Sequence, residues 1–313
     1  MEVQKINQSN SRSHSHSNDT FIASLVKARA KRKTFKQIVP SLIKHSLLIL
    51  VGLSMLLPFF WMVSTSLKTS GNVFAVPPQW IPNPARIQNF ADVFTAVPFL
   101  RFVLNTVGYT VAVAFFEVTA SIMVAYGFAR FRFRFKKTLF MFLLVTIMIP
   151  GEISIVPGYI FWVKLGQIFG TSFINTYVPL ILPAIGGQAV FIFFMTQYFR
   201  TIPKDFSEAA YINGAGSWTI LWKIYFPMSL PAILTITISS VMGVWNAFLA
   251  PLIYLNDSNL FPIQVGLSLF KGSFSTNWSL LMAATTLSVI PMILLFFSLQ
   301  KYFIPSNKQD GVK

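Results

Sequence analysis

The sequence predicts an all-α membrane protein with six transmembrane helices, and three observations support that fold class. Hydrophobic residues make up 54% of the 313 residues, and the mean hydropathy is +0.62. Charged residues make up only 11% of the chain, against about 25% in an average soluble domain. The apolar residues gather in six long runs, with most basic residues between them. Such a chain cannot cover a water-facing surface, so most of its surface must face lipid or other protein.

Each apolar run is close to the roughly 20 residues that a helix needs to cross a bilayer core. The first run has too long a leader, and is itself too long, for a typical cleaved signal peptide, so we interpret it as a retained helix. The predicted spans are about 42–66, 105–127, 138–160, 176–198, 228–254 and 278–300. Together they predict a transmembrane domain over residues 42–304.

Basic residues are distributed unequally between the two sides of the membrane. With a cytoplasmic N-terminus, the inside segments hold 20 of the 25 Lys and Arg residues and the outside segments hold five. Cytoplasmic loops of membrane proteins carry such an excess. We therefore predict that both termini are cytoplasmic. The basic hairpin 128–137 is the strongest inside marker, and we expect its arginines to anchor at the lipid interface.

The charge and the missing cysteines exclude several classes of function. The net charge is +16, but the basic residues lie in clusters between apolar spans, which favours lipid contact over a nucleic-acid partner. In the basic tail 1–41, the stretch 21–39 is either an amphipathic helix on the membrane surface or a flexible charged segment. The absence of Cys excludes disulfides, thiolate metal sites and cysteine nucleophiles, and we expect no metal site.

The predicted inside segment 199–226 has, over residues 203–226, the pattern of a helix, a tight turn and a second helix. Pro203 suits a first helical turn, and the acidic residues that follow it lie where the helix dipole favours anions. Gly214 and Gly216 permit the turn, and Ser217 is the expected N-cap of the second helix. Small residues on the first helix allow a partner to approach it closely.

This segment resembles the EAA loop of binding-protein-dependent ABC transporter permeases. The matching residues are Glu208, Ala209, Ala210, Gly214, Ile224 and Pro227. The resemblance implies that 199–226 is a coupling loop, with a coupling helix that docks onto an ATPase subunit. The expected coupling residues are Glu208, Ala209, Ala210, Asn213, Gly214, Ala215 and Gly216. Many family members have Asp at the position of Asn213, whose amide can still form hydrogen bonds.

Other segments are similar to the MalG-like subunit of carbohydrate-uptake importers. They are Ser64–Lys68, Pro77–Pro82, Asn89–Phe90, Ala125–Arg130 and Trp245–Leu252. The similarity covers roughly residues 42–304 and implies a type I ABC importer (MetI-like) permease fold. Residues 305–313 depart from the usual Gly-rich end of the family, and we expect a short cytoplasmic tail there.

The resemblance also implies a function and a set of partners. It implies the permease subunit of an ATP-driven importer for a sugar or oligosaccharide, in a bacterial inner membrane. The implied partners are a second homologous permease, a dimer of ATPase subunits holding ATP and Mg, and an extracytoplasmic sugar-binding protein. The chain lacks the pattern Gly-x4-Gly-Lys-Ser/Thr, so we expect no cofactor and no enzymatic activity of its own. A glycerol-phosphate-like solute and an ion-coupled secondary transporter are the alternatives.

Three residues are candidates for the substrate path. Glu117 lies near the middle of the second span, where a carboxylate costs on the order of 3 kcal/mol to insert, so it should face protein or water. It either lines the path or bonds to a neighbouring helix. Trp245 and Asn246 offer a flat apolar ring and an amide, as a sugar site requires. The alternative for Trp245 is an anchor at the membrane interface.

Two further features concern the outer side. The loop after the fifth span, with Asn256, Asp257 and Lys271, corresponds to the family's contact with the binding protein, and the alternative is a plain connector. Glu152 follows Pro150 and Gly151, which predict a helix break. This break either shapes a gate or marks a simple loop entry.

Overall fold

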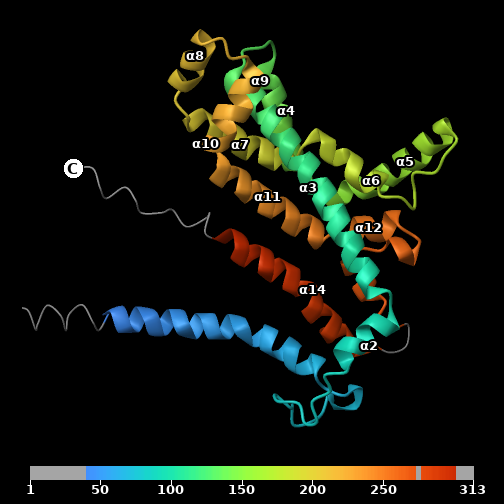
Figure 1. Ribbon diagram of the computed structural model, residues 1–313. Coiled ribbons are helices and arrows are strands. Elements are labelled where there is room, and N and C mark those ends of the chain that lie inside the picture. The colour runs from blue at the N-terminus through green and yellow to red at the C-terminus, as the bar shows by residue number, and fades with distance from the viewer. Residues whose placement is uncertain (1–39, 273–275, 301–313) are drawn as a thin grey trace, which may run out of the picture. The chain divides into compact units, whose positions relative to one another are not determined.

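The computed structural model describes residues 40–272 and 276–300 (Figure 1). The described residues are helical, apart from turns, loops and one isolated β-bridge between Lys271 and Thr276, which confirms the all-α prediction for this part of the chain. The chain divides into two compact units, one ending at Trp61 and one beginning at Met62. The predictions for the tails 1–39 and 305–313 lie outside the described residues.

The first apolar run forms one continuous helix, Pro40–Ser66, as expected. It is 27 residues long, and the apolar side chains over most of its length are exposed. Its apolar residues surround the helix rather than forming one stripe, which is typical of a segment that crosses a membrane.

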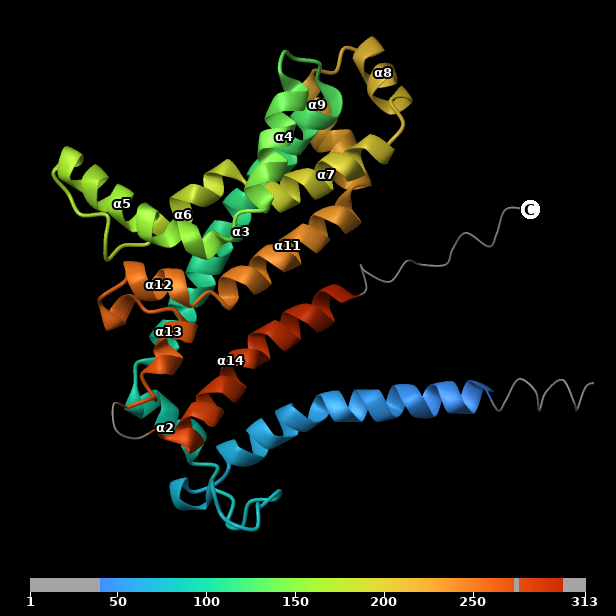
Figure 2. The same ribbon diagram turned by 180° about the vertical axis from the view of Figure 1, so that it is seen from behind.

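The second unit is arranged around α3, Phe99–Arg130, which at 32 residues is its longest helix. Helices α7 (Ala189–Thr201) and α11 (Leu230–Trp245) pack along it, and Figures 1 and 2 both show them beside its length. Because α3 presents buried residues at helical spacing to both neighbours, its central face forms the core of this unit.

Two of the predicted spans are not single helices: 138–160 is bent at the break that the sequence predicted after Pro150, and 228–254, expected to be continuous, is interrupted. Helix α4 (Lys136–Ile147) ends before Pro150, and η2 (Gly151–Ser154) with α5 (Ile155–Phe169) continues at an angle of 95°. Proline has no backbone N–H and disfavours a helical residue before it, which explains the break.

The second bend, of 83°, separates two runs of helix at Ser229. The first run contains α9 (Ser217–Ile220), the π-helix η4 (Leu221–Tyr225) and α10 (Phe226–Met228). The second run is α11, which begins with Leu230-Pro231, where proline is tolerated. Helix α12 (Leu249–Tyr254) is separate from α11, so the predicted end at residue 254 was too late.

The predicted span 176–198 contains α6 (Val178–Ile181), η3 (Leu182–Gly186) and α7, with a break between η3 and α7. At this break Gly187 has a φ of +73°, and a Cβ there would lie 3.0 Å from the backbone N of Ser121 on α3. A glycine is required for both reasons. The Oγ of Ser121 accepts the N–H of Gln188 at 3.1 Å, so α3 satisfies the backbone donor of the N-cap residue that precedes α7.

Four short elements and one long helix complete the second unit. The short elements are η1 (Ser70–Asn72), α2 (Asn89–Ala96), η5 (Ser258–Leu260) and α13 (Ile263–Ser268), and the long helix is α14 (Trp278–Leu299). In the described residues, four helices are long and apolar enough to cross a membrane, and six if each bent pair counts as one span.

Candidate functional site

The segment 203–226 forms the expected helix, turn and second helix. The first helix is α8, Asp205–Ile212. Two details differ from the prediction. Pro203 precedes the helix, whose N-cap is Lys204, and the N-cap of the second helix is Gly216 rather than Ser217. Ser217 instead lies 3.0 Å from the Tyr211 hydroxyl through its Oγ and so connects the two helices.

A Schellman motif ends α8, and it explains the glycine at position 214. The N–H of Ala215 donates to the carbonyl of Ala210 at 3.0 Å, and the N–H of Gly214 donates to that of Tyr211, also at 3.0 Å. This pattern requires a left-handed residue, and Gly214 has a φ of +80°. The Nδ2 of Asn213 donates to the carbonyl of Ala209 at 2.8 Å. Gly216 has a φ of −75°, so its conformation does not require glycine.

The outer face of α8 is apolar and exposed. Ile212 is 87% exposed and Phe206 is 49% exposed, with Glu208 and Ala209 also exposed beside them. Ala210 and Ala215 are half-buried and pack on the core beneath. An apolar patch beside two exposed carboxylates, those of Asp205 and Glu208, on a short helix has the chemistry of a surface that another protein covers.

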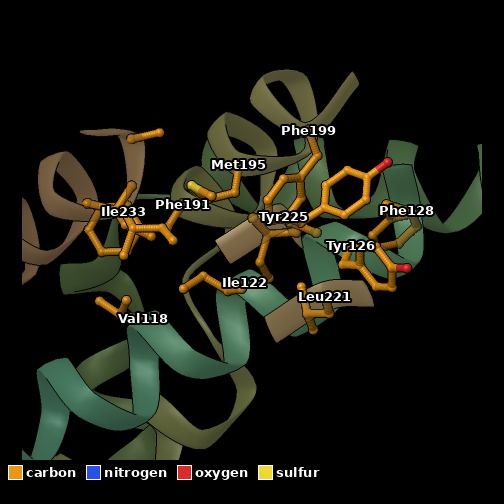
Figure 3. Close-up of a cluster of buried hydrophobic side chains, with 14 of the residues drawn as sticks. Val118, Ile122, Tyr126, Phe128, Phe191, Met195, Phe199, Leu221, Tyr225 and Ile233 are labelled. Carbon is orange, nitrogen blue, oxygen red and sulfur yellow. The ribbon is translucent and has the colours of Figure 1, made fainter. Parts of the chain in front are cut away.

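Three aromatic rings support this loop from below, and we name Tyr126, Phe199 and Tyr225 the ring cluster. The rings pack edge-to-face, with centroids 5.2 Å apart for Tyr126 and Tyr225 and 5.6 Å apart for Phe199 and Tyr225 (Figure 3). They come from α3, α7 and η4, so the ring cluster joins the loop to both α3 and α7. Tyr225 is fully buried, and its hydroxyl lies 3.5 Å from the Oγ of Ser207 on α8.

Arg130 fixes the same junction by hydrogen bonds. Its Nη2 donates to the carbonyls of Phe199 and Ile202 at 2.5 Å each, and its guanidinium lies 4.7 Å from the centroid of the Tyr225 ring. It therefore closes the C-terminal end of α7, where carbonyls have no helical partner. The expectation that the arginines of 128–137 anchor at lipid does not hold for Arg130. Arg132 and Arg134 are exposed.

Glu117 lies on α3 beside α11. Its carboxylate is hydrogen-bonded to the hydroxyl of Ser240 on α11, and Ser240 is buried. Of the two alternatives, this placement favours the bond to a neighbouring helix. The bond joins α3 to α11 across their packed interface and so helps to fix the register of the two helices.

Trp245 and Asn246 have different surroundings although they are adjacent. Trp245 is only 4% exposed, and its indole N–H donates to the carbonyl of Ser288 on α14 at 3.3 Å. This placement favours packing between α11 and α14. Asn246 is exposed, and its Oδ1 accepts from the Nε2 of Gln264 at 3.3 Å.

The residues expected to meet a binding protein, Asn256, Asp257 and Lys271, are all exposed. The backbone N–H groups of Asn256 and Asp257 both donate to the Oδ1 of Asn175 at 2.9 Å. The carboxylate of Asp257 caps η5 by accepting the N–H of Asn259. Lys271 lies at the isolated β-bridge. Glu152 lies in η2, at the break that the sequence predicted, and is exposed.

Sequence reasoning missed several structural residues. Asn89 is buried, and its Nδ2 donates to the carbonyls of Ser66 and Lys68 at 2.8 Å each. Asn175 holds a left-handed backbone with a φ of +63°. The sequence placed Asn89 in a segment similar to the family and Arg130 at a helix end, but neither observation identifies a hydrogen-bond partner. Among the described residues no cluster of three or more His, Cys, Asp or Glu side chains could hold a metal ion.

Comparison with known proteins agrees with this architecture. The family described as "Binding-protein-dependent transport system inner membrane component" matches residues 117–309. The chain is 33% identical over 261 residues to a probable ABC transporter permease protein, YurM, of Bacillus subtilis, covering 82% of this chain and 83% of that one. It is 30% identical to an arabinooligosaccharides transport permease, AraQ, of Halalkalibacterium halodurans, covering 74% and 81%.

A solved structure shares the fold. It is a bacterial ABC transporter involved in the import of the acidic polysaccharide alginate, with a TM-score of 0.71 and 24% identity, covering 85% of this chain and 96% of that one. The family match spans more than half of the chain and includes α8, the Schellman turn and the ring cluster residues Phe199 and Tyr225. The chain therefore belongs to the family of binding-protein-dependent transport system inner membrane components.

Proposed function

We propose that this chain is a permease subunit of an ATP-driven ABC importer for a sugar or oligosaccharide. The observation that carries the proposal is the loop 203–226. Its outer face is apolar and exposed at Phe206 and Ile212, while its base is joined to α3 and α7 through the ring cluster. A partner that moves α8 therefore displaces the long helices with it, which is what coupling of ATP hydrolysis to transport requires.

The chain crosses a bacterial cell membrane six times, with both termini in the cytoplasm. Each bent helix pair counts as one span, and the positive-inside excess sets the orientation. This orientation places α8 on the cytoplasmic side and the loop after α12 outside. The exposed apolar side chains of Pro40–Ser66 are covered by lipid or by another permease subunit.

The partners follow from this arrangement. A dimer of ATPase subunits binds ATP and Mg and takes one coupling loop from each of two homologous permeases. A substrate-binding protein delivers the solute from outside. The sugar class is supported by relatives whose descriptions name arabinooligosaccharides and alginate. Hydrolysis belongs to the ATPase, so this chain contributes transport and coupling rather than catalysis.

Two exposed isoleucines provide a matched test of the docking face. Ile212 lies on α8 and is 87% exposed, and Ile81 lies in the loop after the first helix and is 79% exposed. Neither is buried in this chain, so replacing either with Asp leaves the fold intact. With the complete complex expressed together, we expect Ile212→Asp to lose co-purifying ATPase and Ile81→Asp to retain it. Equal retention in both variants would contradict docking at α8.

The charge on the same face is tested by Glu208→Lys, which reverses it without changing a buried contact. We expect the ATPase activity of the reconstituted complex to lose its stimulation by sugar-loaded binding protein. Transport that continues after ATP depletion, but stops when the ion gradient is collapsed, would overturn the proposal in favour of secondary transport.

A further inference from the structure

A groove with a mainly apolar lining and several polar groups opens between α13 and α14, away from the coupling loop. It has a volume of about 390 Å³, which lies within the size range of small-molecule sites. Its lining combines an aromatic ring and three aliphatic or thioether side chains with an amide, two hydroxyls and a cation. The lining residues are Phe248, Gln264, Leu267, Ser268, Lys271, Leu281, Met282 and Thr285.

The polar groups of the groove retain capacity for a ligand. The hydroxyls of Ser268 and Thr285 donate to backbone carbonyls at 2.6 and 2.7 Å, so their oxygens remain free to accept. The Nε2 of Gln264 donates to Asn246, and its Oε1 faces no donor among the described residues. Lys271 is exposed and forms no ion pair or hydrogen bond through its ammonium in the described part of the chain.

A polar line along α11 meets the groove through the hydrogen bond from Gln264 to Asn246. Asn246, bonded to Gln264, is the last member of a set at helical spacing that also includes Thr235, Ser239 and Gly243. These four are exposed or half-buried, whereas the neighbouring Ile236 and Ser240 are buried. The hydroxyls of Thr235 and Ser239 each donate to the carbonyl four residues earlier at 2.9 Å and keep their acceptor positions. Polar side chains in membrane helices face a water-filled cavity or other protein.

We infer that this groove and the polar face of α11 are one solute path, and that the groove takes a saccharide with an acidic group. The ring of Phe248, which is 42% exposed, stacks on the apolar face of a pyranose. Gln264 and the two hydroxyls meet sugar hydroxyls, and the ammonium of Lys271 meets a carboxylate or phosphate. The inference rests on the proposed transport function and deepens it by naming the path and the solute class.

The chain has no Cys, so single cysteines can be placed without removing others. In the assembled complex in proteoliposomes, Ser239→Cys and Asn246→Cys are labelled with a membrane-impermeant methanethiosulfonate reagent. Leu294→Cys, at an exposed apolar position on α14, is the matched control. Only a thiolate in contact with water reacts, so we expect labelling about tenfold faster at residues 239 and 246 than at 294. Rates equal to that of the control would overturn the path.

The solute class is tested in the groove itself. Ser268→Cys is labelled in the presence of digalacturonate or of lactose, with Lys271 intact or replaced by Gln. We expect digalacturonate to protect about threefold to fivefold better than lactose with Lys271, and no better with Lys271→Gln. If digalacturonate and lactose protected the cysteine at residue 268 equally, both with Lys271 and with Lys271→Gln, the preference for an acidic solute would be overturned. Protection by the substrate-binding protein alone, and by neither sugar, would show a protein contact and overturn the inference.

These results are separable from the coupling proposal. Labelling rates in the groove do not require ATPase docking, and co-purification of the ATPase does not require an open groove. A complex that loses the ATPase with Ile212→Asp but shows no labelling along α11 therefore contradicts the path alone. A complex that labels along α11 but keeps the ATPase with Ile212→Asp contradicts docking at α8 alone.

Discussion

The two ends of the second unit hold their segments by different kinds of contact. At the end that carries α8, which the proposed function makes the coupling end, aromatic rings and one guanidinium pack α8 and η4 against α3 and α7. At the other end rings also pack, as Tyr109 and Tyr177 do, but there asparagine amides in addition bind backbone groups of the loops, as Asn89 and Asn175 do. Rings that interdigitate transmit a displacement because they leave no free space. Amides satisfy loop backbone that has no helical partner. We therefore expect the end that carries α8 to be stiff, and we call the other end, where amides hold the loops, the scaffolded end.

Tyr225→Ala is the strongest way to break this comparison. It removes a fully buried ring from the ring cluster and leaves a cavity. We expect a loss of about 3–5 kcal/mol in the free energy of unfolding, measured by denaturation of the detergent-solubilised protein. Tyr225→Phe keeps the ring and loses only the 3.5 Å contact with Ser207, so it should cost well under half as much. If the two variants were equally unstable, packing would not be the source of the rigidity.

Arg130→Ala tests the polar part of the same end. It removes two hydrogen bonds to the carbonyls at the end of α7, and leaves both carbonyls without that donor. Bonds from a charged donor contribute about 1.5–3 kcal/mol, so we expect a loss near 2–3 kcal/mol in unfolding free energy. Arg132→Ala is the control, because Arg132 is exposed and should change stability little. A similar loss in both variants would indicate a general charge effect in place of a specific one.

Asn89→Ala tests the scaffolded end. The change leaves the carbonyls of Ser66 and Lys68 without their donor, at an expected cost of about 2 kcal/mol. Hydrogen exchange around residues 64–90 should accelerate, while co-purification of the ATPase should persist. Gln88→Ala, at an exposed neighbour, should change neither measurement. Loss of the ATPase with Asn89→Ala would mean that the two ends are not independent.

The sequence predicted the coupling end better than the scaffolded end. Periodicity and the Glu-Ala-Ala-x3-Gly pattern located α8 and its turn within a residue or two, because turn chemistry is local. Arg130 was interpreted as a lipid anchor, because a single sequence does not show that the carbonyls of α7, 69 and 72 residues away, lie within reach.

Of the breaks in the predicted spans, the sequence located the one after Pro150 and missed the others for a related reason. Hydropathy measures the length of an apolar run and carries little information on its direction, so the run 228–254 was interpreted as one continuous span. The break at Gly187 depends on the close approach of α3 at Ser121, which is a tertiary contact. The bond from Glu117 to Ser240 spans 123 residues and was likewise inaccessible, although the cost of an intramembrane carboxylate predicted that it needed a partner.

Gly214→Ala has the smallest expected effect on stability and the sharpest meaning for coupling. A Cβ at residue 214 meets no atom within 4 Å, so the only cost is the left-handed backbone, about 1 kcal/mol. Gly216→Ala is the matched control: its Cβ also meets nothing, but its φ is −75°. Gly214→Asn should recover part of the loss, because Asn tolerates this conformation.

The readout is the stimulation of ATPase activity by sugar-loaded binding protein in the reconstituted complex. If α8 transmits force through its Schellman turn, Gly214→Ala should reduce this stimulation while Gly216→Ala and the basal ATPase rate stay unchanged. An equal reduction in both alanine variants would mean that stimulation requires a flexible chain at these two positions and not the left-handed conformation of Gly214. The stiffness assigned to this end would then reside in the ring cluster alone, and the turn would serve only to reverse the chain.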